Sequence, residues 1–453
     1  MVLMNKINLM RHGKSVGNEQ GIIQGLCDFP LSNQGIIDLE NCNYTELSNI
    51  KKIYSSSLSR AINTANIVKK RIDYNGNVIV DHRLDEVNLG ILNGKSFEFC
   101  KTNYPNAYQI FKKRGDYDEI EGADSWIYTQ ARVISFLDKY LYSENENDLL
   151  VTHASYIRTF VNLILGRYRN TQFNIDNGFM FHYDDPLKNI DIFNYDIAKA
   201  SIVKRVKCYD NTYIMKKRYS KLNQSDYHEK IILEYLNDYF ETPLNIYMYD
   251  NDECKIKISK YLEGVHKFGE LTHKELVSLV KSTRLLNSCL KNYPKTLFTK
   301  NNIIDELKEA IDVLIDENAR NKVLDILCDD RFINYINKSE YNLVHNDLHR
   351  SNILFDNDKV HIIDYESVQM YPDLLQLSTL ICSSFLLETQ IDSFDVFFNN
   401  WNDNLDIDLI NKLIDYRLLF GLSFFDNKIR NNDFDDSDIE IKKKYIKALG
   451  GRR

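Results

Sequence analysis

Two histidines and two arginines lie at or just beyond the carboxyl ends of strand-like apolar segments in the first half of the sequence. They are Arg11, His12, Arg60 and His153. The segments that precede them span residues 6–10, 52–55 and 148–152. Because ligands bind at the carboxyl ends of the strands in an open α/β sheet, we expect one crevice to collect all four side chains.

This combination of side chains suits phosphoryl transfer. A neutral imidazole is a competent nucleophile for phosphorus near neutral pH. Two guanidinium groups can bind phosphate oxygens bidentately and spread the charge that develops during transfer, and a second imidazole adds another donor. A carboxylic acid must then protonate the leaving oxygen, and residues 84–90 supply Asp85 and Glu86 as candidates.

Five motifs in this half, in matching order and spacing, resemble the signature of the histidine phosphatase superfamily, which includes the cofactor-dependent phosphoglycerate mutases. They lie at residues 9–18, 24–35, 55–65, 84–94 and 151–158. The resemblance covers about residues 4–195. Since the domain is compact and lacks long insertions beyond these motifs, the resemblance favours a phosphatase over a glycolytic mutase.

The resemblance implies a role for each residue of the constellation. His12 becomes phosphorylated. The residues that hold the phosphate are Arg11, Arg60 and His153, with Asn18 as a further contact. Glu86 is the implied acid, and Asp85 is the alternative.

A second set of polar residues lies between residues 345 and 366. The sequence reads His-Asn-Asp-Leu-His-Arg-Ser-Asn-Ile-Leu from residue 345, and an apolar strand then ends at Asp364. Asp347 could take the proton of a substrate hydroxyl, while Asn352 and Asp364 could hold Mg²⁺ on the phosphates of ATP. Positioning and charge neutralisation are most of what such a reaction asks of a protein.

This stretch resembles the catalytic loop of the aminoglycoside phosphotransferase and choline kinase families more closely than that of protein kinases. The resemblance covers about residues 198–430. It implies that Lys216, or alternatively Lys217, binds ATP and that Glu229 pairs with this lysine. It also implies that residues 258–264 form the hinge that contacts adenine.

One feature departs from the kinase pattern. The first hairpin turn, at residues 198–201, contains no glycine. Glycines let backbone N–H groups approach phosphates closely. Other backbone amides and Ser201 would therefore have to contact the nucleotide.

Two further features have simple structural explanations. The acidic run at residues 433–440 could attract a cationic substrate, but the start of a solvated helix explains it better. Four aromatic residues could form a cage for a choline-type cation. They are Trp401, Tyr416, Phe424 and Phe425. In so aromatic a chain, core packing is the better explanation.

The elements that must position these residues change in pattern near residue 198. Before it, apolar strands alternate with amphipathic helices such as residues 57–71, which is typical of a parallel sheet with helices on both faces. After it, a hairpin at 201–217 and a helix at 226–239 precede mostly helical sequence. We predict a three-layer α/β histidine phosphatase fold over residues 1–197, followed by a two-lobed, protein-kinase-like α+β domain over residues 198–453.

Composition narrows the class of protein. The 453 residues carry a net charge of -8, which argues against a general nucleic-acid binder. No apolar run approaches the roughly 18 residues that a membrane span needs, and the start of the sequence lacks the features of a signal peptide. The eight cysteines are scattered, which predicts free thiols in a reducing cytoplasm.

We therefore predict a bifunctional cytoplasmic enzyme. Its phosphatase would hydrolyse a small-molecule phosphate ester, and its kinase would transfer the γ-phosphoryl group of ATP, or another nucleoside triphosphate, to a small-molecule alcohol. In one alternative, the kinase-like domain is catalytically silent and senses nucleotide to regulate the phosphatase. In another it phosphorylates protein or RNA, against which the net charge and the choline-kinase-like loop argue. The sequence leaves both substrates and the oligomeric state open.

Overall fold

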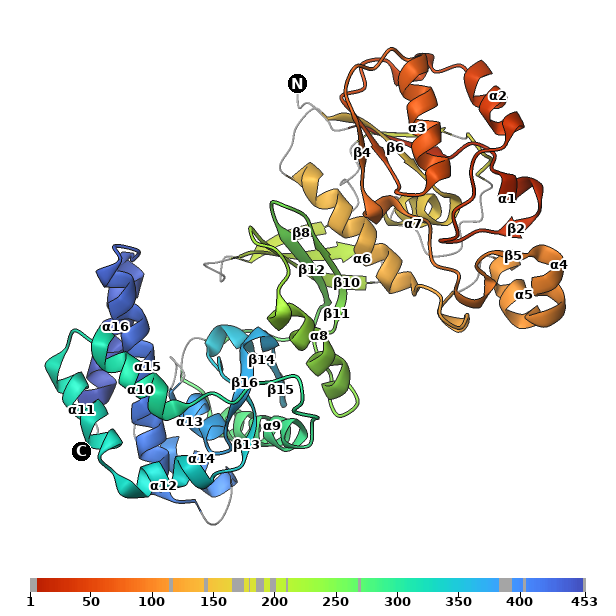
Figure 1. Cartoon of the computed structure of the whole chain (residues 1–453). Helices are drawn as coiled ribbons and strands as arrows, with labels where there is room; N and C mark the ends of the chain where they lie inside the picture. The colour runs from red at the N-terminus through yellow and green to blue at the C-terminus, as the bar shows by residue number, and fades with distance from the viewer. Residues whose placement is uncertain are drawn as a thin grey trace. The chain divides into compact units, whose positions relative to one another are not determined.

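The computed structural model of the chain describes residues 6–113, 117–141, 146–164, 175–178, 180–184, 191–195, 201–208, 211–267, 270–382, 393–401 and 405–450. The chain divides into two compact units (Figure 1). Unit 1 comprises Met1–Lys221 and Asn245–Tyr261, and unit 2 comprises Leu222–Leu244 and Leu262–Arg453. Each unit is described by itself below.

The first sheet of unit 1 confirms the predicted α/β arrangement. Its strand order is β4 (Val78–Val80), β3 (Lys52–Ser55), β6 (Asn147–Thr152), β1 (Lys6–Arg11) and β7 (Met180–Asp184). The first four strands are parallel, and β7 pairs antiparallel with β1 at the edge. The carboxyl ends of β1, β3 and β6 therefore lie side by side, as predicted.

Alternating side chains along the central strands build a core on each face of this sheet. Ile7 and Leu9 belong to the cluster that contains buried residues of α6 (Trp126–Leu137) and α7 (Ala154–Ile164). Met10 belongs to the opposite cluster, with residues of α2 (Asn33–Asn41) and α3 (Ser59–Arg71). Because successive side chains of a strand point to opposite faces, one apolar strand supplies both layers.

Shorter elements surround this three-layer domain. They are α1 (Val16–Glu19), β2 (Ile22–Ile23), η2 (His82–Leu84), β5 (Lys95–Ser96), α4 (Phe97–Asn103) and α5 (Pro105–Lys113). Helix α3 begins two residues after the predicted residue 57, because the Ser57 backbone N–H and hydroxyl both bond to Asp85.

A second, antiparallel sheet of unit 1 contains the predicted hairpin. Its strand order is β11 (Asn245–Asp250), β12 (Lys255–Lys260), β10 (Asn211–Arg218), β9 (Ile202–Cys208) and β8 (Asp191–Tyr195). Strand β8 lies on the N-terminal side of the predicted 197/198 boundary, yet it pairs with β9. The boundary itself stays a prediction, since residues 196–200 lie outside the described part of the chain.

Helix α6 joins the two sheets of unit 1 through one hydrophobic core (Figure 1). All of its residues from 129 to 137 are buried. The same cluster holds buried side chains of the second sheet and of the connection between β11 and β12, namely Val206, Cys208, Tyr213, Met215, Tyr247, Cys254, Ile256 and Ile258. The helix is therefore covered by the first sheet on one side and by the second sheet on the other.

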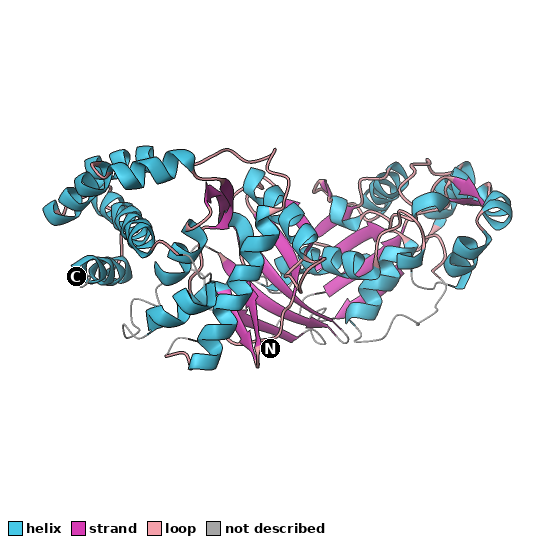
Figure 2. Ribbon diagram, turned by 90° about the horizontal axis from the view of Figure 1, so that it is seen from below, coloured by secondary structure: helices cyan, strands magenta, loops and turns pink. Residues whose placement is uncertain are grey.

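Unit 2 is mostly helical, as predicted, and Figure 2 shows helix around the C-terminus. Its helices are α8 (Gln224–Leu236), α9 (His273–Lys291), α10 (Ile303–Val313), α11 (Glu317–Leu327), α12 (Asp330–Lys338), α13 (Leu375–Cys382), α14 (Ser393–Trp401), α15 (Ile407–Arg430) and α16 (Asp436–Gly450). Strands β13 (Tyr341–His345) and β16 (Val368–Pro372) pair with each other, and so do β14 (Ile353–Asp356) and β15 (Lys359–Ile362). The antiparallel sheet and this helical part confirm the predicted α+β class.

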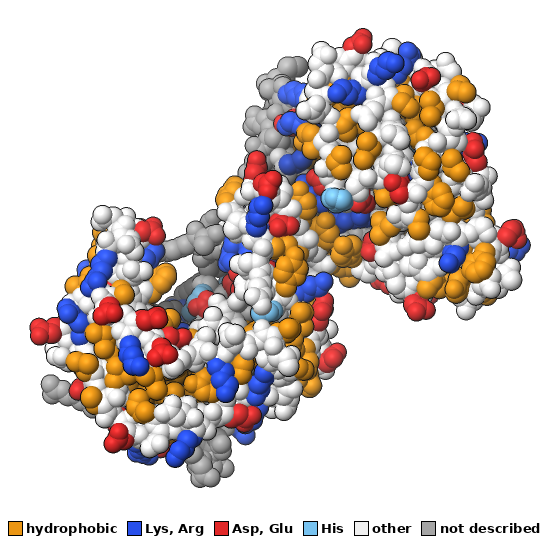
Figure 3. Space-filling model, in the orientation of Figure 1, with side chains coloured by type: hydrophobic (Ala, Val, Ile, Leu, Met, Phe, Trp, Pro, Cys, Tyr) orange, Lys and Arg blue, Asp and Glu red, His pale blue; other side chains and the backbone are white. Residues whose placement is uncertain are grey.

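The acidic run takes the structural role that the sequence favoured. Core packing is confirmed for two of the four aromatic residues, whereas the prediction is wrong for Phe424, which is 58% exposed. The Asp438 N–H donates to the Asp435 carboxylate at 2.9 Å, at the start of α16. Trp401 and Tyr416 are buried in the core of unit 2. On the face drawn in Figure 3, basic and acidic side chains are interspersed. Within the described residues, no helix is long and apolar enough to span a membrane.

Candidate active sites

His12 follows β1 and is buried, with 3% of its surface exposed. Its Nδ1 lies 2.7 Å from the Gly13 carbonyl oxygen. Since a carbonyl only accepts, Nδ1 carries the proton, and Nε2 keeps its lone pair. Burial, together with the charges of Arg11 and Arg60, holds the pKa of His12 well below its usual value. The imidazole is therefore neutral at pH 7, the form that a nucleophilic role requires.

Arg11 and Arg60 are anchored by backbone carbonyls but retain unused donors. Arg11 Nη1 donates to the Ile175 carbonyl at 2.5 Å. Arg60 donates to the carbonyls of Gly25 and Cys27, each at 2.9 Å. Among the described residues, the buried Nε atoms of both arginines have no hydrogen-bond partner. Burial lowers the pKa of Arg11 to about 10, so this side chain remains charged, and the arginines offer donors to an anion such as phosphate.

His153 faces His12, and their ring centroids lie 5.1 Å apart. Its Nε2 lies 2.8 Å from Ser56 Oγ, and Ser56 Oγ in turn donates to Asp85 at 2.8 Å. Ser56 must therefore accept the Nε2–H of His153. The buried Nδ1 has no hydrogen-bond partner among the described residues. Burial, followed by the charge of Arg60, lowers the pKa of His153 well below its usual value.

The Glu86 carboxylate lies at the N-terminus of α7, the helix that begins directly after His153. It accepts hydrogen bonds from the backbone N–H groups of Val87 (2.9 Å), Tyr156 (3.2 Å) and Ser155 (3.4 Å). Its charge counteracts the effect of burial on the pKa values of Arg11 and Arg60, which places it beside both guanidinium groups.

Asp85, the alternative acid, has different neighbours. Its carboxylate accepts hydrogen bonds from the Ser57 N–H (2.7 Å), the Ser57 hydroxyl and the Ser56 hydroxyl. The His82 ring lies 3.3 Å away. These contacts commit Asp85 to holding the loop after β3, and they favour Glu86 as the acid.

Asn177 is a residue of this site that the sequence did not reveal. Its Nδ2 donates to the His12 carbonyl at 3.0 Å and lies 3.2 Å from Asn18 Oδ1. Asn18 Oδ1 also accepts from the Ser15 N–H in a capping box that begins α1. Since both contacts use the oxygen of Asn18, its NH₂ group is left for a further acceptor. Asn177 is far from the other motifs and has no pattern around it, so nothing in the sequence pointed to it.

In unit 2, Asp347 lies just after β13 and contacts two neighbours on its own loop. Asn352 Nδ2 donates to the Asp347 carbonyl (2.9 Å) and carboxylate (3.2 Å). His349 Nε2 lies 3.3 Å from the same carboxylate. Burial raises the pKa of Asp347, but the hydrogen bond from His349 and the charges of His349, His345 and Arg417 together outweigh it, so the net shift is downward. The sequence assigned no role to His349.

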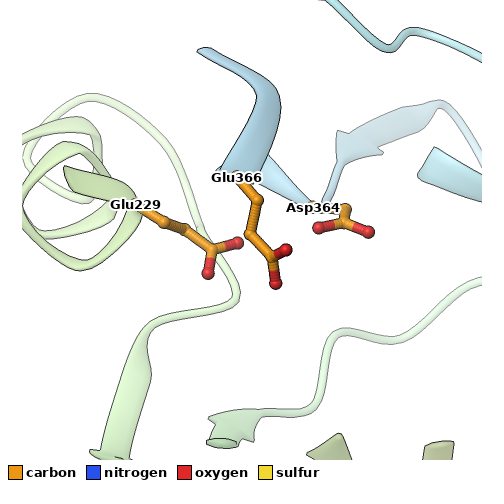
Figure 4. Close-up of side chains that lie close together, drawn as sticks. All are labelled: Glu229, Asp364 and Glu366. Carbon is orange, nitrogen blue, oxygen red and sulfur yellow. The ribbon is translucent and has the colours of Figure 1, made fainter. Parts of the chain in front are cut away.

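Three carboxylates of unit 2 point toward one another (Figure 4). Glu229 comes from α8, Asp364 precedes the short helix η7 (Tyr365–Ser367), and Glu366 lies within η7. One oxygen atom of each lies within 4.8 Å of the others. The Tyr365 N–H donates to Glu229 at 3.1 Å. Asp364 has a φ of 64°, a left-handed conformation that is costly for a residue with a Cβ. Such an oxygen set fits Mg²⁺, and the sequence had not assigned Glu366 to it.

The remaining predicted nucleotide residues lie in unit 1. Lys216 lies in β10, and Ser201 directly precedes β9. The turn before Ser201 lies outside the described residues. The pairing of Lys216 with Glu229 would join the two units and stays a prediction.

Comparison with known proteins identifies relatives of the N-terminal domain. The family model of the histidine phosphatase superfamily (branch 1) matches residues 7–181. Phosphoserine phosphatase 1 of Hydrogenobacter thermophilus is 30% identical over 166 residues, 36% of this chain and 77% of that protein. The 2,3-bisphosphoglycerate-dependent phosphoglycerate mutase of Thermoplasma acidophilum is 32% identical over 161 residues, 35% of this chain and 74% of that protein.

Among solved structures, two phosphotransferases are similar to this chain. Choline kinase LicA from Streptococcus pneumoniae is 16% identical, with a TM-score of 0.44. The superposition covers 59% of this chain and 95% of that chain. Spectinomycin phosphotransferase, in complex with ADP and spectinomycin, is 13% identical, with a TM-score of 0.42. The superposition covers 58% of this chain and 88% of that chain. The matches of family model and relatives coincide with the residues that build the His12 site, and this chain therefore belongs, through its N-terminal domain, to branch 1 of the histidine phosphatase superfamily.

Proposed function

We propose that this chain is a bifunctional phosphate-transfer enzyme. Its first site hydrolyses a small-molecule phosphomonoester through a phosphohistidine, and its second uses ATP to phosphorylate a small-molecule hydroxyl. The observation that carries the first activity is the buried, neutral His12, with Nε2 open beside the unused donors of Arg11 and Arg60.

The phosphatase reaction has two balanced steps. His12 Nε2 attacks phosphorus, the bond to the leaving oxygen breaks, and Glu86 gives that oxygen its proton. The ionised Glu86 then takes a proton from water, whose oxygen attacks the phosphohistidine and releases inorganic phosphate. Arg11 and Arg60 bind the phosphoryl oxygens in both steps, with Asn18 as a further contact, and His153 would donate to them through Nδ1 when this nitrogen is protonated. We favour hydrolysis over mutase chemistry because the domain carries no long insertion beyond the motifs.

Replacement of the nucleophile tests this activity. We expect His12→Ala to lower hydrolysis of an aryl phosphate by about 10³-fold or more, because the covalent route is lost. Brief incubation with ³²P-labelled substrate should leave acid-labile label on the wild type only. His273→Ala, at an exposed position in α9, is the matched control and should retain full activity. Activity retained in His12→Ala would contradict the nucleophile assignment.

For the second site, we propose that Asp347 takes the proton of the acceptor hydroxyl. Asn352 and Asp364 would hold Mg²⁺, and the clustering of Asp364 with Glu229 and Glu366 supports a cation there. Asn352 fits this role because its Nδ2 donates to Asp347, which leaves its oxygen available. When bound, Mg²⁺ would neutralise charge on the phosphates of ATP.

The nucleotide contacts proposed for this site complete the assignment. Lys216 would bind the phosphates of ATP and pair with Glu229, as the kinase resemblance implies. Ser201 and nearby backbone amides would replace the missing glycine-rich turn.

Transfer of label from ATP to a mixture of metabolites tests the kinase activity. We expect Asp347→Asn to lower the transfer by about 10²-fold or more, because the base is lost. Asp358→Asn is the control, since its side chain is 70% exposed and forms an ion pair with Lys274 at the surface. Unchanged transfer in Asp347→Asn would contradict the assignment of Asp347 as the base. Binding of ATP without any transfer by the wild type would instead support a nucleotide-sensing role.

We further propose that the protein works in the reducing cytoplasm. All eight cysteines lie among the described residues, and all are free thiols. This observation supports the compartment that the scattered cysteines predict. The proposed partners are small-molecule phosphate esters and alcohols.

A further inference from the structure

The catalytic acid candidate directly follows a short segment that is held at several points. Asp81 begins η2 by accepting the Arg83 N–H at 2.9 Å. The Leu84 carbonyl accepts the Thr152 hydroxyl at 2.5 Å. Asp85 then bonds to the loop after β3, and Glu86 is the next residue. Any group that holds Arg83 therefore helps to set the position of Glu86.

Arg83 is held in turn by the first domain and by the second sheet. Its guanidinium forms a bidentate pair with Asp81, at 3.0 and 2.7 Å, and Nη1 donates to the Ser135 carbonyl of α6 at 2.7 Å. Its Cζ lies 3.8 Å from the ring centroid of Tyr249 in β11. The planar hydrogen bonds fix the plane of the guanidinium, and the tyrosine covers it.

A second connection runs through α6. Arg132 in this helix approaches the Glu86 carbonyl, at 3.4 and 3.5 Å. Two residues earlier in the helix, Gln130 accepts hydrogen bonds from the Tyr213 hydroxyl and from Asn211 Nδ2, both in β10. The second sheet therefore contacts both supports of Glu86, the η2 segment and α6.

We propose that Tyr249 is a positioning residue for the phosphatase: by stacking on Arg83 it holds the 81–86 segment so that Glu86 can protonate the leaving oxygen. The inference rests on the proposed phosphatase activity. It means that the second sheet, which carries Lys216, is part of the apparatus that aligns the acid of the first site. A small displacement of a catalytic group can cost a large part of its contribution.

Leaving-group dependence isolates this role, because only a poor leaving group needs the acid. The value of kcat/KM reports the steps up to phosphoryl transfer to His12 and does not include hydrolysis of the phosphohistidine. It is measured with 2-phenylethyl phosphate, whose alkoxide must be protonated, and with 4-nitrophenyl phosphate, whose anion leaves unaided. Glu86→Gln provides the reference for a lost acid, with a large decrease for the alkyl ester only.

We expect Tyr249→Ala to lower kcat/KM for the alkyl ester roughly tenfold and to change the aryl ester less than about threefold. Tyr249→Phe keeps the aromatic face and should restore the wild-type ratio of the two values. Tyr249→Leu keeps apolar volume without the aromatic face, so it tests the role if the alanine variant folds poorly. Met215→Ala, in the same shared core, is the control: it should lower stability and leave the ratio unchanged.

Each outcome bears on one of the two proposals. A wild-type ratio in both Tyr249→Ala and Tyr249→Leu overturns the positioning role. An equal loss for both esters, matched by Met215→Ala, also overturns it, because general loosening of the core would then suffice. If the wild type hydrolyses neither ester, the phosphatase proposal itself fails.

Discussion

The two arginines beside His12 act on its chemistry in two ways. Their positive charge, added to burial, keeps the imidazole neutral and therefore nucleophilic. In the proposed reaction, the same charge would attract a phosphate dianion and stabilise the charge that moves onto the phosphoryl oxygens. His153 lies under the same influences, and its pKa is also lowered by burial first and by Arg60 next. Both histidines of the site are therefore neutral near pH 7.

These lowered pKa values predict how stability depends on pH. The unfolded chain protonates His12 and His153 around pH 6.5, whereas the folded protein protonates these two residues only at lower pH. The free energy of unfolding therefore decreases as pH falls below about 6.5. We expect His12→Asn and His153→Asn each to reduce this slope by up to about 1.4 kcal/mol per pH unit. Denaturant unfolding between pH 7 and 5, without phosphate, measures the slope, and an unchanged slope would contradict the prediction.

Helix α6 shows how one element serves two neighbours. An amphipathic surface helix usually exposes a polar face, yet residues 129–137 are all buried. The two sheets of unit 1 cover its opposite sides. Two polar side chains on or next to this helix have partners in the second sheet: Gln130 accepts a hydrogen bond from Tyr213, and Asp138, which follows the helix, pairs with Lys217 at 2.6 Å.

The loops that carry Glu86 and the residues after it depend on glycines in different ways. Gly90 and Gly122 both have positive φ values, of 56° and 72°. A Cβ on Gly90 would lie 2.0 Å from the Glu121 carbonyl oxygen, whereas a Cβ on Gly122 would meet nothing closer than 3.6 Å. Gly122→Ala should therefore cost only the left-handed conformation, about 1–2 kcal/mol.

Gly90→Ala should cost more than Gly122→Ala. The clash with backbone adds about 1–3 kcal/mol to the conformational cost, because the Glu121 carbonyl cannot move aside like a flexible side chain. Denaturant midpoints of the two variants and the wild type give the comparison. Equal destabilisation by the two alanines would show that the contact between the two loops is not rigid.

At the scale of the whole molecule, unit 1 is built from two separate parts of the chain. The chain completes the first sheet, adds β8 to β10, leaves to form α8 in unit 2, and returns for β11 and β12. The second sheet therefore packs on α6 with strands from both sides of α8. Part of what the sequence assigned to the kinase-like domain stabilises the phosphatase domain.

Truncation tests this shared core. A fragment of residues 1–197 follows the predicted boundary but removes β9 to β12 and uncovers one side of α6. We expect this fragment to unfold at a temperature roughly 5–10 °C or more below the corresponding transition of the full chain and to bind a hydrophobic dye, because side chains of α6 such as Tyr128, whose ring packs against Tyr247 of β11, lose their cover. A fragment that melts with the full chain and binds no dye would show that the first domain is independent.

The sequence by itself predicted three central strands of the first sheet, the hairpin of the second, the helices at residues 57–71 and 226–239, and the convergence of His12, Arg60, Glu86 and His153. Each lies in a short motif with its own strand or turn, and parallel strands must bring their carboxyl ends to one edge of the sheet. The loop from Asp347 to Asn352 was predictable for the same reason, since its contacts are local.

Only the tertiary structure decided the contacts between distant single residues. Asn177 reaches His12 across 165 positions of the chain, and Tyr249 reaches Arg83 across the two sheets of unit 1. A lone asparagine or tyrosine carries no periodic signal, so its partner is set by how whole elements pack. The division of the chain into units also depends on how whole elements pack. Local sequence patterns change near residue 198, but apolar side chains of α6 and of both sheets are buried together in one core.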